Sequence, residues 1–244
     1  MSLLKIQNVT KRFGGLIAVD DVSFEIAEGE VLGLIGPNGA GKTTLFNSIS
    51  GTYTPEEGSI TFAGETITGV APHENAQRGL VRTFQIVKPF AGLNVVDNVK
   101  VGSFLRNSNA RAAEDKAREI VEFVGLGDSA DRLAKNLTTA GRKRLELARA
   151  LATEPRLLLL DEVMAGLTPT ESRQIVDVIK QIKTQYNLTL LVIEHVMQAV
   201  MSLSDRIAVL HHGQLIAIDA PQVIASDNAV IEAYLGKEFE FAEN

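Results

Sequence analysis

The sequence contains no cysteine and no tryptophan, and aromatic residues make up only 5% of it. The lack of cysteine excludes a disulfide scaffold, a cysteine-ligated zinc site and a thiol nucleophile. Long apolar runs are also missing: the run at residues 157–160 is typical, whereas a membrane-spanning helix needs about 18 apolar residues. The N-terminal residues lack the apolar core of a signal peptide. We therefore expect a protein of the cytoplasm without a membrane segment of its own.

A surplus of basic residues is missing too. Lysine and arginine total 24, aspartate and glutamate total 30, and the net charge is −6. Proteins that bind nucleic acid usually carry a basic surplus, so we expect no nucleic-acid partner. Hydrophobic residues make up 45% of the 244 residues and charged residues 22%, as in ordinary globular proteins. That length suits one large domain or two small ones.

Short runs rich in valine, isoleucine and leucine alternate with longer segments of helical periodicity. Four nearly continuous apolar runs predict buried strands: Val31–Ile35, 157–160, 188–193 and 206–210. This alternation predicts an α/β fold with a mostly parallel sheet. Segments 4–9, 22–26 and 59–62 alternate apolar and polar residues instead, which predicts a half-exposed antiparallel β region near the N-terminus.

The stretch from about residue 95 to 151 has helical patterns and few strand signals. Its clearest pattern lies at 110–124, where one face carries Ala113, Ala117, Ile120, Val121 and Val124. We interpret this stretch as a helical insert. The predicted organisation is a single domain of residues 1–244, with a helical subdomain at about 92–153 and a C-terminal helical tail at about 220–244.

A phosphate-binding motif follows the first predicted buried strand. The pattern G-x-x-x-x-G-K-[ST] is fitted by Gly36, Pro37, Asn38, Gly39, Ala40, Gly41, Lys42 and Thr43. The motif opens the predicted helix Lys42–Ser50, whose N-terminal N–H groups and positive dipole end favour a phosphate. Lys42 would reach the β- and γ-phosphates, Thr43 would ligate Mg²⁺, and Thr44 would also contact the nucleotide. Binding of a nucleoside triphosphate is the strongest prediction.

Two acidic residues supply a partner for this motif. Asp161 and Glu162 directly follow the apolar run 157–160, at the strand end where open α/β sheets place ligands. Asp161 would hold Mg²⁺, and Glu162 would orient or deprotonate an attacking water molecule. The alternative is that both acids merely cap the next helix.

Together these residues resemble the ATP-binding cassette family, in particular the ATPase subunits of transporters, over nearly the whole chain. The resemblance implies a P-loop NTPase fold with a RecA-like parallel sheet core, with ATP and Mg²⁺ as cofactors. It implies that Asp161 is the magnesium ligand and Glu162 the catalytic glutamate. Gln85 matches the family's glutamine loop, which senses Mg²⁺ and the nucleophilic water. His195 matches the switch histidine at the γ-phosphate, and Phe13 matches the aromatic residue that stacks on adenine.

The resemblance is weakest at the signature Leu-Ser-Gly-Gly-Gln, which in the family contacts ATP bound to the opposite subunit. Here Leu137 is followed by Thr138, Thr139, Ala140 and Gly141. Added β-carbons at the two glycine positions would hinder close backbone approach, although a one-residue shift toward Gly141 stays open. In the loop after Glu162, Val163 replaces the usual proline and Thr168 the usual aspartate.

Family cassettes work as head-to-tail dimers that enclose two ATP molecules. Because the phosphate loop is complete and the signature is degenerate, we expect a heterodimer with a second ABC ATPase subunit, and a homodimer is the alternative. Segments 82–85 and 193–197 look most like cassettes of branched-chain amino acid importers. That likeness implies an ATP-hydrolysing importer subunit on the cytoplasmic face of the membrane, with two permease subunits and an external solute-binding protein. A urea, amide or lipopolysaccharide transport cassette, a non-transport ABC ATPase and a small-molecule kinase remain alternatives.

Overall fold

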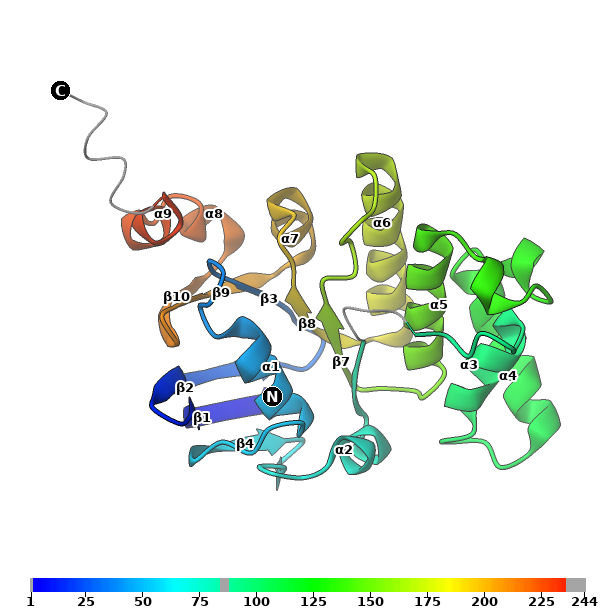
Figure 1. Cartoon of the computed structure of the whole chain (residues 1–244), viewed down its shortest axis with the longest axis horizontal. Helices are drawn as coiled ribbons and strands as arrows, with labels where there is room; N and C mark the ends of the chain where they lie inside the picture. Colours follow the sequence, from blue (N-terminus) through cyan, green and yellow to red (C-terminus); the bar gives the residue numbers. More distant parts are fainter. Residues whose placement is uncertain (1, 84–87, 236–244) are drawn as a thin grey trace. The chain divides into compact units, whose positions relative to one another are not determined.

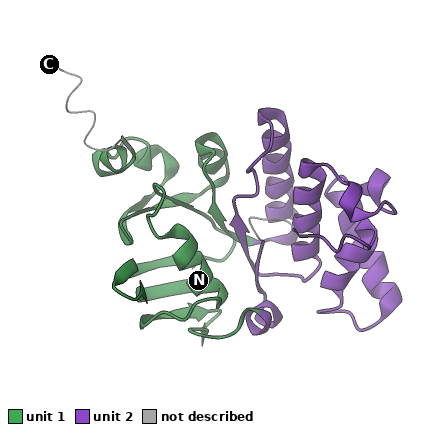
Figure 2. Cartoon of the chain, in the orientation of Figure 1, with its two compact units in different colours: residues 1–72, 189–244 green, residues 73–188 purple. Residues whose placement is uncertain are grey.

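The computed structural model describes residues 2–83 and 88–235 of the chain. They fall into two compact units (Figure 2). The first unit comprises residues 1–72 and 189–244, and the second comprises residues 73–188. The chain therefore leaves the first unit and returns to it after completing the second.

An antiparallel sheet forms one part of the first unit. Its strands are β1 (Ser2–Phe13), β2 (Leu16–Ala27), β4 (Glu57–Phe62) and β5 (Glu65–Thr66), in the order β2-β1-β4-β5. All of its pairings are antiparallel. Alternate residues of the strands are buried, among them Leu4, Ile6 and Ile60. This confirms the antiparallel region expected from the alternating pattern.

The other strands of the first unit surround β3 (Val31–Ile35). On one side it pairs in parallel with β8 (Thr189–Ile193) and on the other with β9 (Arg206–His211), which in turn pairs antiparallel with β10 (Gln214–Asp219). Every residue of β3 and β8 is buried, as the continuous apolar runs predict. The helices of this unit are α1 (Lys42–Ser50), α7 (Met197–Leu203), α8 (Pro221–Ile224) and α9 (Asn228–Leu235), which Figure 1 labels.

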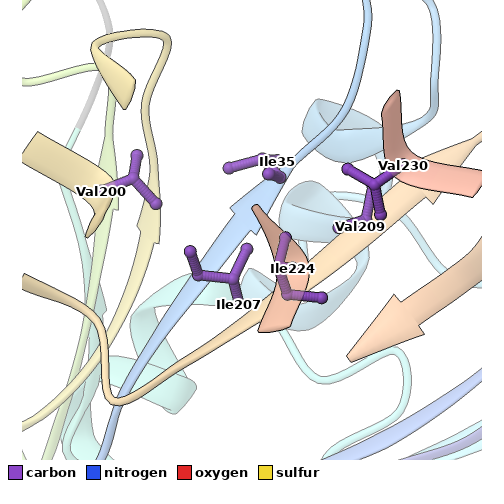
Figure 3. Close-up of a cluster of buried hydrophobic side chains, with 6 residues drawn as sticks. All are labelled: Ile35, Val200, Ile207, Val209, Ile224 and Val230. Atoms are coloured by element: carbon purple, nitrogen blue, oxygen red, sulfur yellow. The ribbon is translucent and has the colours of Figure 1, made fainter. Parts of the chain in front are cut away.

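A cluster of buried aliphatic side chains joins these helices to the strands. Figure 3 shows its members, which come from β3, β9, α7, α8 and α9: Ile35, Val200, Ile207, Val209, Ile224 and Val230. Burial of such side chains is the main favourable contribution to folding. Ile35 is the last residue of β3, so the cluster supports the point where the phosphate loop begins.

The second unit is mostly helical. It carries α3 (Val95–Ser103), α4 (Ala110–Phe123), α5 (Thr139–Leu151) and α6 (Pro169–Tyr186), and α2 (Pro72–Arg78) lies at its start. Its strands β6 (Leu80–Arg82) and β7 (Leu157–Asp161) pair in parallel. Helix α4 buries Ala113, Ala117, Ile120 and Val121, the face predicted from the sequence. No helix in the described residues is long and apolar enough to cross a membrane.

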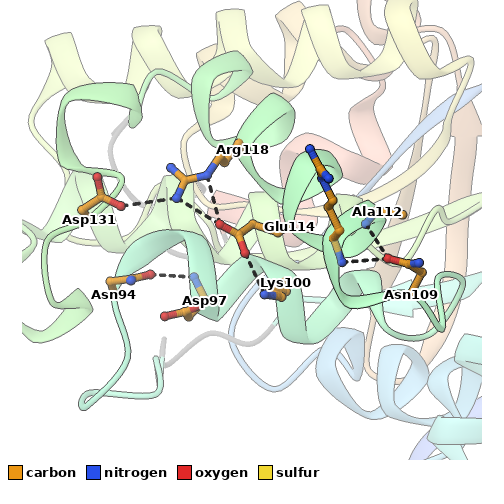
Figure 4. A network of polar contacts seen from close by, with 9 residues as sticks. Asn94, Asp97, Lys100, Asn109, Ala112, Glu114, Arg118 and Asp131 are labelled. Atoms are coloured by element: carbon orange, nitrogen blue, oxygen red, sulfur yellow. Dashed lines mark hydrogen bonds and ion pairs between the residues drawn. The ribbon is translucent and has the colours of Figure 1, made fainter.

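Helices α3 and α4 are joined by a polar network (Figure 4). Glu114 of α4 accepts hydrogen bonds from Lys100 Nζ of α3 at 2.9 Å and from Arg118 at 3.1 Å. These two cations lower the pKa of the Glu114 carboxyl, Lys100 more strongly. Asn94 and Asn109 cap the two helices, their side-chain oxygens accepting backbone N–H groups.

Helix α6 begins with a reciprocal capping box. The Thr168 hydroxyl accepts the Glu171 N–H at 3.3 Å, and the Glu171 carboxylate accepts the Thr168 N–H at 2.9 Å. Thr168 therefore caps α6 with its side chain. Thr168→Ala is expected to lower the free energy of unfolding by about 1 kcal/mol, measured by urea denaturation. Exposed Thr170, two residues on, provides the control: Thr170→Ala should cost much less, and an equal loss in both variants would contradict the capping interpretation.

Candidate functional site

Helix α1 begins at the end of the phosphate loop, and no side chain among the described residues caps its N-terminus. Gly41 occupies the N-cap position with a φ of 99°, and no side chain in the described part of the chain caps the helix there. Side chains cap α3, α4, α5 and α6, whereas within the described residues the short helices α7 and α8 also begin without a side-chain cap. Uncapped N–H groups at a helix N-terminus have to find another acceptor, and they favour an anion. This geometry fits a phosphate group.

Two glycines of the loop are required by their surroundings. Gly36 has a φ of 150°, and a β-carbon there would lie 2.1 Å from the Leu210 carbonyl oxygen. A β-carbon on Gly41 would lie 2.3 Å from the Ala18 carbonyl oxygen. The backbone at Leu210 and at Ala18 thus lies too close to the loop for a β-carbon at these positions. Only glycine allows both this close approach and a positive φ.

Lys42 is buried, with 6% of its surface exposed, and its ammonium group faces its own loop. Its Nζ donates to the Gly36 carbonyl at 2.6 Å and to the Pro37 carbonyl at 3.0 Å. The Lys42 ammonium group therefore links the two carbonyls at the start of the loop. Asn38, Gly39 and Thr43 are exposed, Ala40 is buried, and Thr44 is half-buried.

Residues from the C-terminal part of the chain also hold the loop. The Gly213 N–H, in the turn between β9 and β10, donates to the Ala40 carbonyl at 3.0 Å. Burial raises the pKa of the Tyr234 hydroxyl of α9, and the nearby backbone of Gly36 opposes that rise. Sequence reasoning missed both contacts because each joins residues far apart in the chain.

Phe13 lies at the end of β1 and is 43% exposed, so it is not a core residue. Tyr53 meets it edge to face, with ring centroids 5.2 Å apart. Lys11 Nζ lies 5.3 Å from the Phe13 centroid and donates to the Thr54 carbonyl at 2.9 Å. An exposed, laterally supported aromatic ring suits stacking on a planar base. Tyr53 was not singled out from the sequence.

His195 is exposed and follows β8 by two residues. In the register of the parallel pair β3–β8, Leu34 lies opposite Ile193. The phosphate loop and His195 therefore follow the C-terminal ends of two neighbouring parallel strands, at the same edge of the sheet and within one unit. This is the arrangement that a residue near the γ-phosphate needs.

In the second unit, Asp161 ends β7 and is 4% exposed. Burial raises the pKa of its carboxyl group, and the Arg82 guanidinium, which donates to Oδ2 at 3.1 Å, opposes that rise. The Thr83 hydroxyl accepts the Asp161 N–H at 3.1 Å. The carboxylate is thus held at the end of the strand in a defined position.

Glu162 adopts a left-handed backbone conformation with a φ of 48°. Its carbonyl accepts the Lys143 ammonium at 3.1 Å and the Ala165 N–H at 3.1 Å. Such a conformation costs about 1–2 kcal/mol for a residue other than glycine and is often found at functional sites. Helix α6 starts only at Pro169 and is capped by Thr168, so Asp161 and Glu162 do not cap it.

The signature segment forms the start of α5. Thr138 is its N-cap, and the Thr138 hydroxyl accepts the Gly141 N–H at 3.1 Å. Thr138 and Thr139 are exposed, Ala140 is half-buried and Gly141 is buried. Gln85 and Phe84 lie outside the described residues, so the role of Gln85 stays a prediction.

Each unit carries an oxygen donor of the kind that Mg²⁺ prefers. Among residues 2–83 and 88–235, no group of three or more histidine, cysteine, aspartate or glutamate side chains could hold a metal ion. Mg²⁺ instead often binds one or two protein oxygens together with the phosphates of its substrate. The Thr43 hydroxyl and the Asp161 carboxylate are hard oxygen donors of that kind. They belong to the first and the second unit, respectively.

Comparison with known proteins places the chain in a family. A family model described as ABC transporter matches residues 19–165. The high-affinity branched-chain amino acid transport ATP-binding protein LivG of Salmonella typhimurium is 41% identical over 96% of this chain and 98% of its own. The corresponding protein BraF of Pseudomonas aeruginosa is 40% identical over the same shares.

Comparison with solved structures points to the same family. A nucleotide-free ATP-binding cassette from an ABC transporter superposes with a TM-score of 0.87 at 32% identity, covering 97% of this chain and all of the other. The ADP conformation of an ATP-binding cassette has the same TM-score at 33% identity and the same coverage. The family model covers more than half of the chain and the relatives nearly all of it, so the chain belongs to the ATP-binding cassette family of transport ATPases.

Proposed function

We propose that this ATPase drives an importer of branched-chain or related amino acids. The observation that carries the proposal is the likeness to LivG and BraF, whose names state branched-chain amino acid transport, over nearly their full lengths. The sequence similarity at residues 82–85 and 193–197 supports the same assignment.

The residues divide the work of ATP hydrolysis. The N–H groups at the start of α1 and the Lys42 ammonium bind the phosphates, and Phe13 stacks on adenine. Thr43, Asp161 and Gln85 would hold Mg²⁺, which would neutralise charge on the phosphates. Glu162 accepts a proton from the attacking water, and His195 contacts the γ-phosphate.

The partners follow from the departures at residues 138–141. We propose that a second, different cassette supplies an intact signature to the ATP bound here, so that the working dimer is a heterodimer. Thr139 and Ala140 carry β-carbons where close backbone approach to the partner's ATP would require glycine. Two permease subunits bind the pair at the cytoplasmic face of the membrane, and an external solute-binding protein delivers the amino acid.

Reconstitution tests the proposal. The chain is co-expressed with candidate permeases and a candidate second cassette from the same organism, and proteoliposomes containing the complex are given a solute-binding protein. We expect ATP-dependent uptake of labelled leucine, isoleucine or valine, with little ATPase activity from this chain alone. Uptake of urea or amides but not of these amino acids would overturn the substrate, and strongly cooperative hydrolysis by the purified chain alone would overturn the heterodimer.

A further inference from the structure

Asp161 is paired with a cation that belongs to the protein itself. Arg82 ends β6, and its guanidinium lies 3.1 Å from Asp161 Oδ2, with 12% and 5% of the two side chains exposed. A buried carboxylate without a cation is costly, and the arginine supplies the compensating charge. The charge of Asp161 is therefore compensated within the protein itself.

Neighbouring contacts keep the arginine in place. Arg82 Nε donates to the Thr83 carbonyl at 3.3 Å. The Thr83 N–H donates to the Leu159 carbonyl at 2.9 Å, and its hydroxyl accepts the Asp161 N–H at 3.1 Å. These bonds fasten the end of β6 to the end of β7. The backbone at Arg82 is therefore held beside Asp161, with the carboxylate within reach of the guanidinium.

We propose that Arg82 competes with Mg²⁺ for the Asp161 carboxylate and so sets the Mg²⁺ concentration at which the subunit binds nucleotide tightly. This inference rests on the proposed role of Asp161 as magnesium ligand. A second cation at the same carboxylate has to share or displace the arginine, and two cations this close repel one another. Arg82 thus stabilises the Asp161 carboxylate when no Mg²⁺ is bound and opposes the binding of Mg²⁺ to it.

The sign of the effect separates this role from a structural one. If Arg82 merely positioned Asp161, its removal would weaken Mg²⁺ binding. If it competes, Arg82→Gln strengthens Mg²⁺ binding and at the same time destabilises the nucleotide-free protein. Arg82→Lys keeps the positive charge but loses the planar guanidinium that fits a carboxylate. Its Mg²⁺ affinity is therefore expected to lie between those of the wild type and Arg82→Gln.

The experiment measures binding instead of turnover. A ribose-labelled, non-hydrolysable ATP analogue is titrated into the full-length protein while an EDTA buffer sets the free Mg²⁺ concentration. The readout is the free Mg²⁺ concentration that gives half of the gain in nucleotide affinity. For Arg82→Gln we expect this midpoint to fall about tenfold, with a smaller fall for Arg82→Lys. The Tm of nucleotide-free Arg82→Gln should drop by roughly 5 °C or more.

Controls separate failure of the inference from failure of the proposed function. Arg118→Gln removes an exposed arginine from the ion pairs of α4 and should leave the midpoint unchanged. Asp161→Asn should abolish most of the Mg²⁺ response; if it does not, the metal role of Asp161 is wrong and the inference falls with it. If Asp161→Asn behaves as expected but Arg82→Gln keeps or raises the midpoint, the inference alone is overturned. Should Arg82→Gln lack the wild-type circular dichroism spectrum, Arg82→Lys decides by the same criterion.

Discussion

Glu162→Gln is expected to bind ATP and to lose nearly all steady-state hydrolysis. A positioned general base contributes about 10²- to 10⁴-fold to a rate, and glutamine cannot accept the proton. The substitution keeps the size of the side chain. It also leaves untouched the Glu162 carbonyl, whose bonds to Lys143 and Ala165 maintain the local backbone. The loss should therefore lie in turnover and not in folding or affinity.

The measurement combines phosphate release with equilibrium ATP binding, in the assembled complex. Glu119→Gln is a matched control because Glu119 is an exposed glutamate of α4 that pairs with Lys116. It should behave as the wild type does in both assays. Hydrolysis by Glu162→Gln at a rate within threefold of the wild type would refute the general-base role, and loss of ATP binding would point to a structural role instead.

Lys42→Ala is expected to weaken ATP binding by about 10- to 100-fold, the range for loss of a charged hydrogen-bonding group. The ammonium group supplies positive charge for the phosphates. It also bridges the Gly36 and Pro37 carbonyls, so alanine is expected to loosen the loop as well. Because the lysine is assigned to the β- and γ-phosphates, the loss should be larger for ATP than for ADP.

Isothermal titration with ATP and with ADP checks this difference. Lys180→Ala removes a lysine from the exposed face of α6 and should leave both affinities unchanged. An equal loss for ATP and ADP would contradict the γ-phosphate assignment. Unchanged ATP affinity in Lys42→Ala would contradict the phosphate-binding role altogether.

The parts of the fold that sequence predicted well are those set by local pattern. β3 and α1 have the predicted bounds because a continuous apolar run, a glycine-rich loop and a helical period follow one another without interruption. The run at 188–193 predicted β8 one residue too long, since Leu188 bonds to the end of α6 instead. β6 was not predicted, because three residues are too few to show a period.

The candidate site divides in the same way. Gly36–Lys42 and Asp161–Glu162 could be found from the sequence because residue type, spacing and the preceding strand specify the chemistry together. The sequence could not predict the Arg82–Asp161 ion pair or the hydrogen bond between Gly213 and Ala40. Each depends on strand pairing between distant segments, for which the sequence carries no local signal.

The return of the chain to its first unit has a consequence for biosynthesis. β3 is made early, but its pairing partners β8 and β9 begin at residues 189 and 206. Residues 73–188 are contiguous and can fold as the ribosome releases them, because domains generally fold as units during synthesis. The strand before the phosphate loop acquires its neighbours only near the end of translation. A polypeptide terminated before residue 189 carries the whole motif but lacks the strands that pair with β3, so we expect such a fragment not to bind ATP.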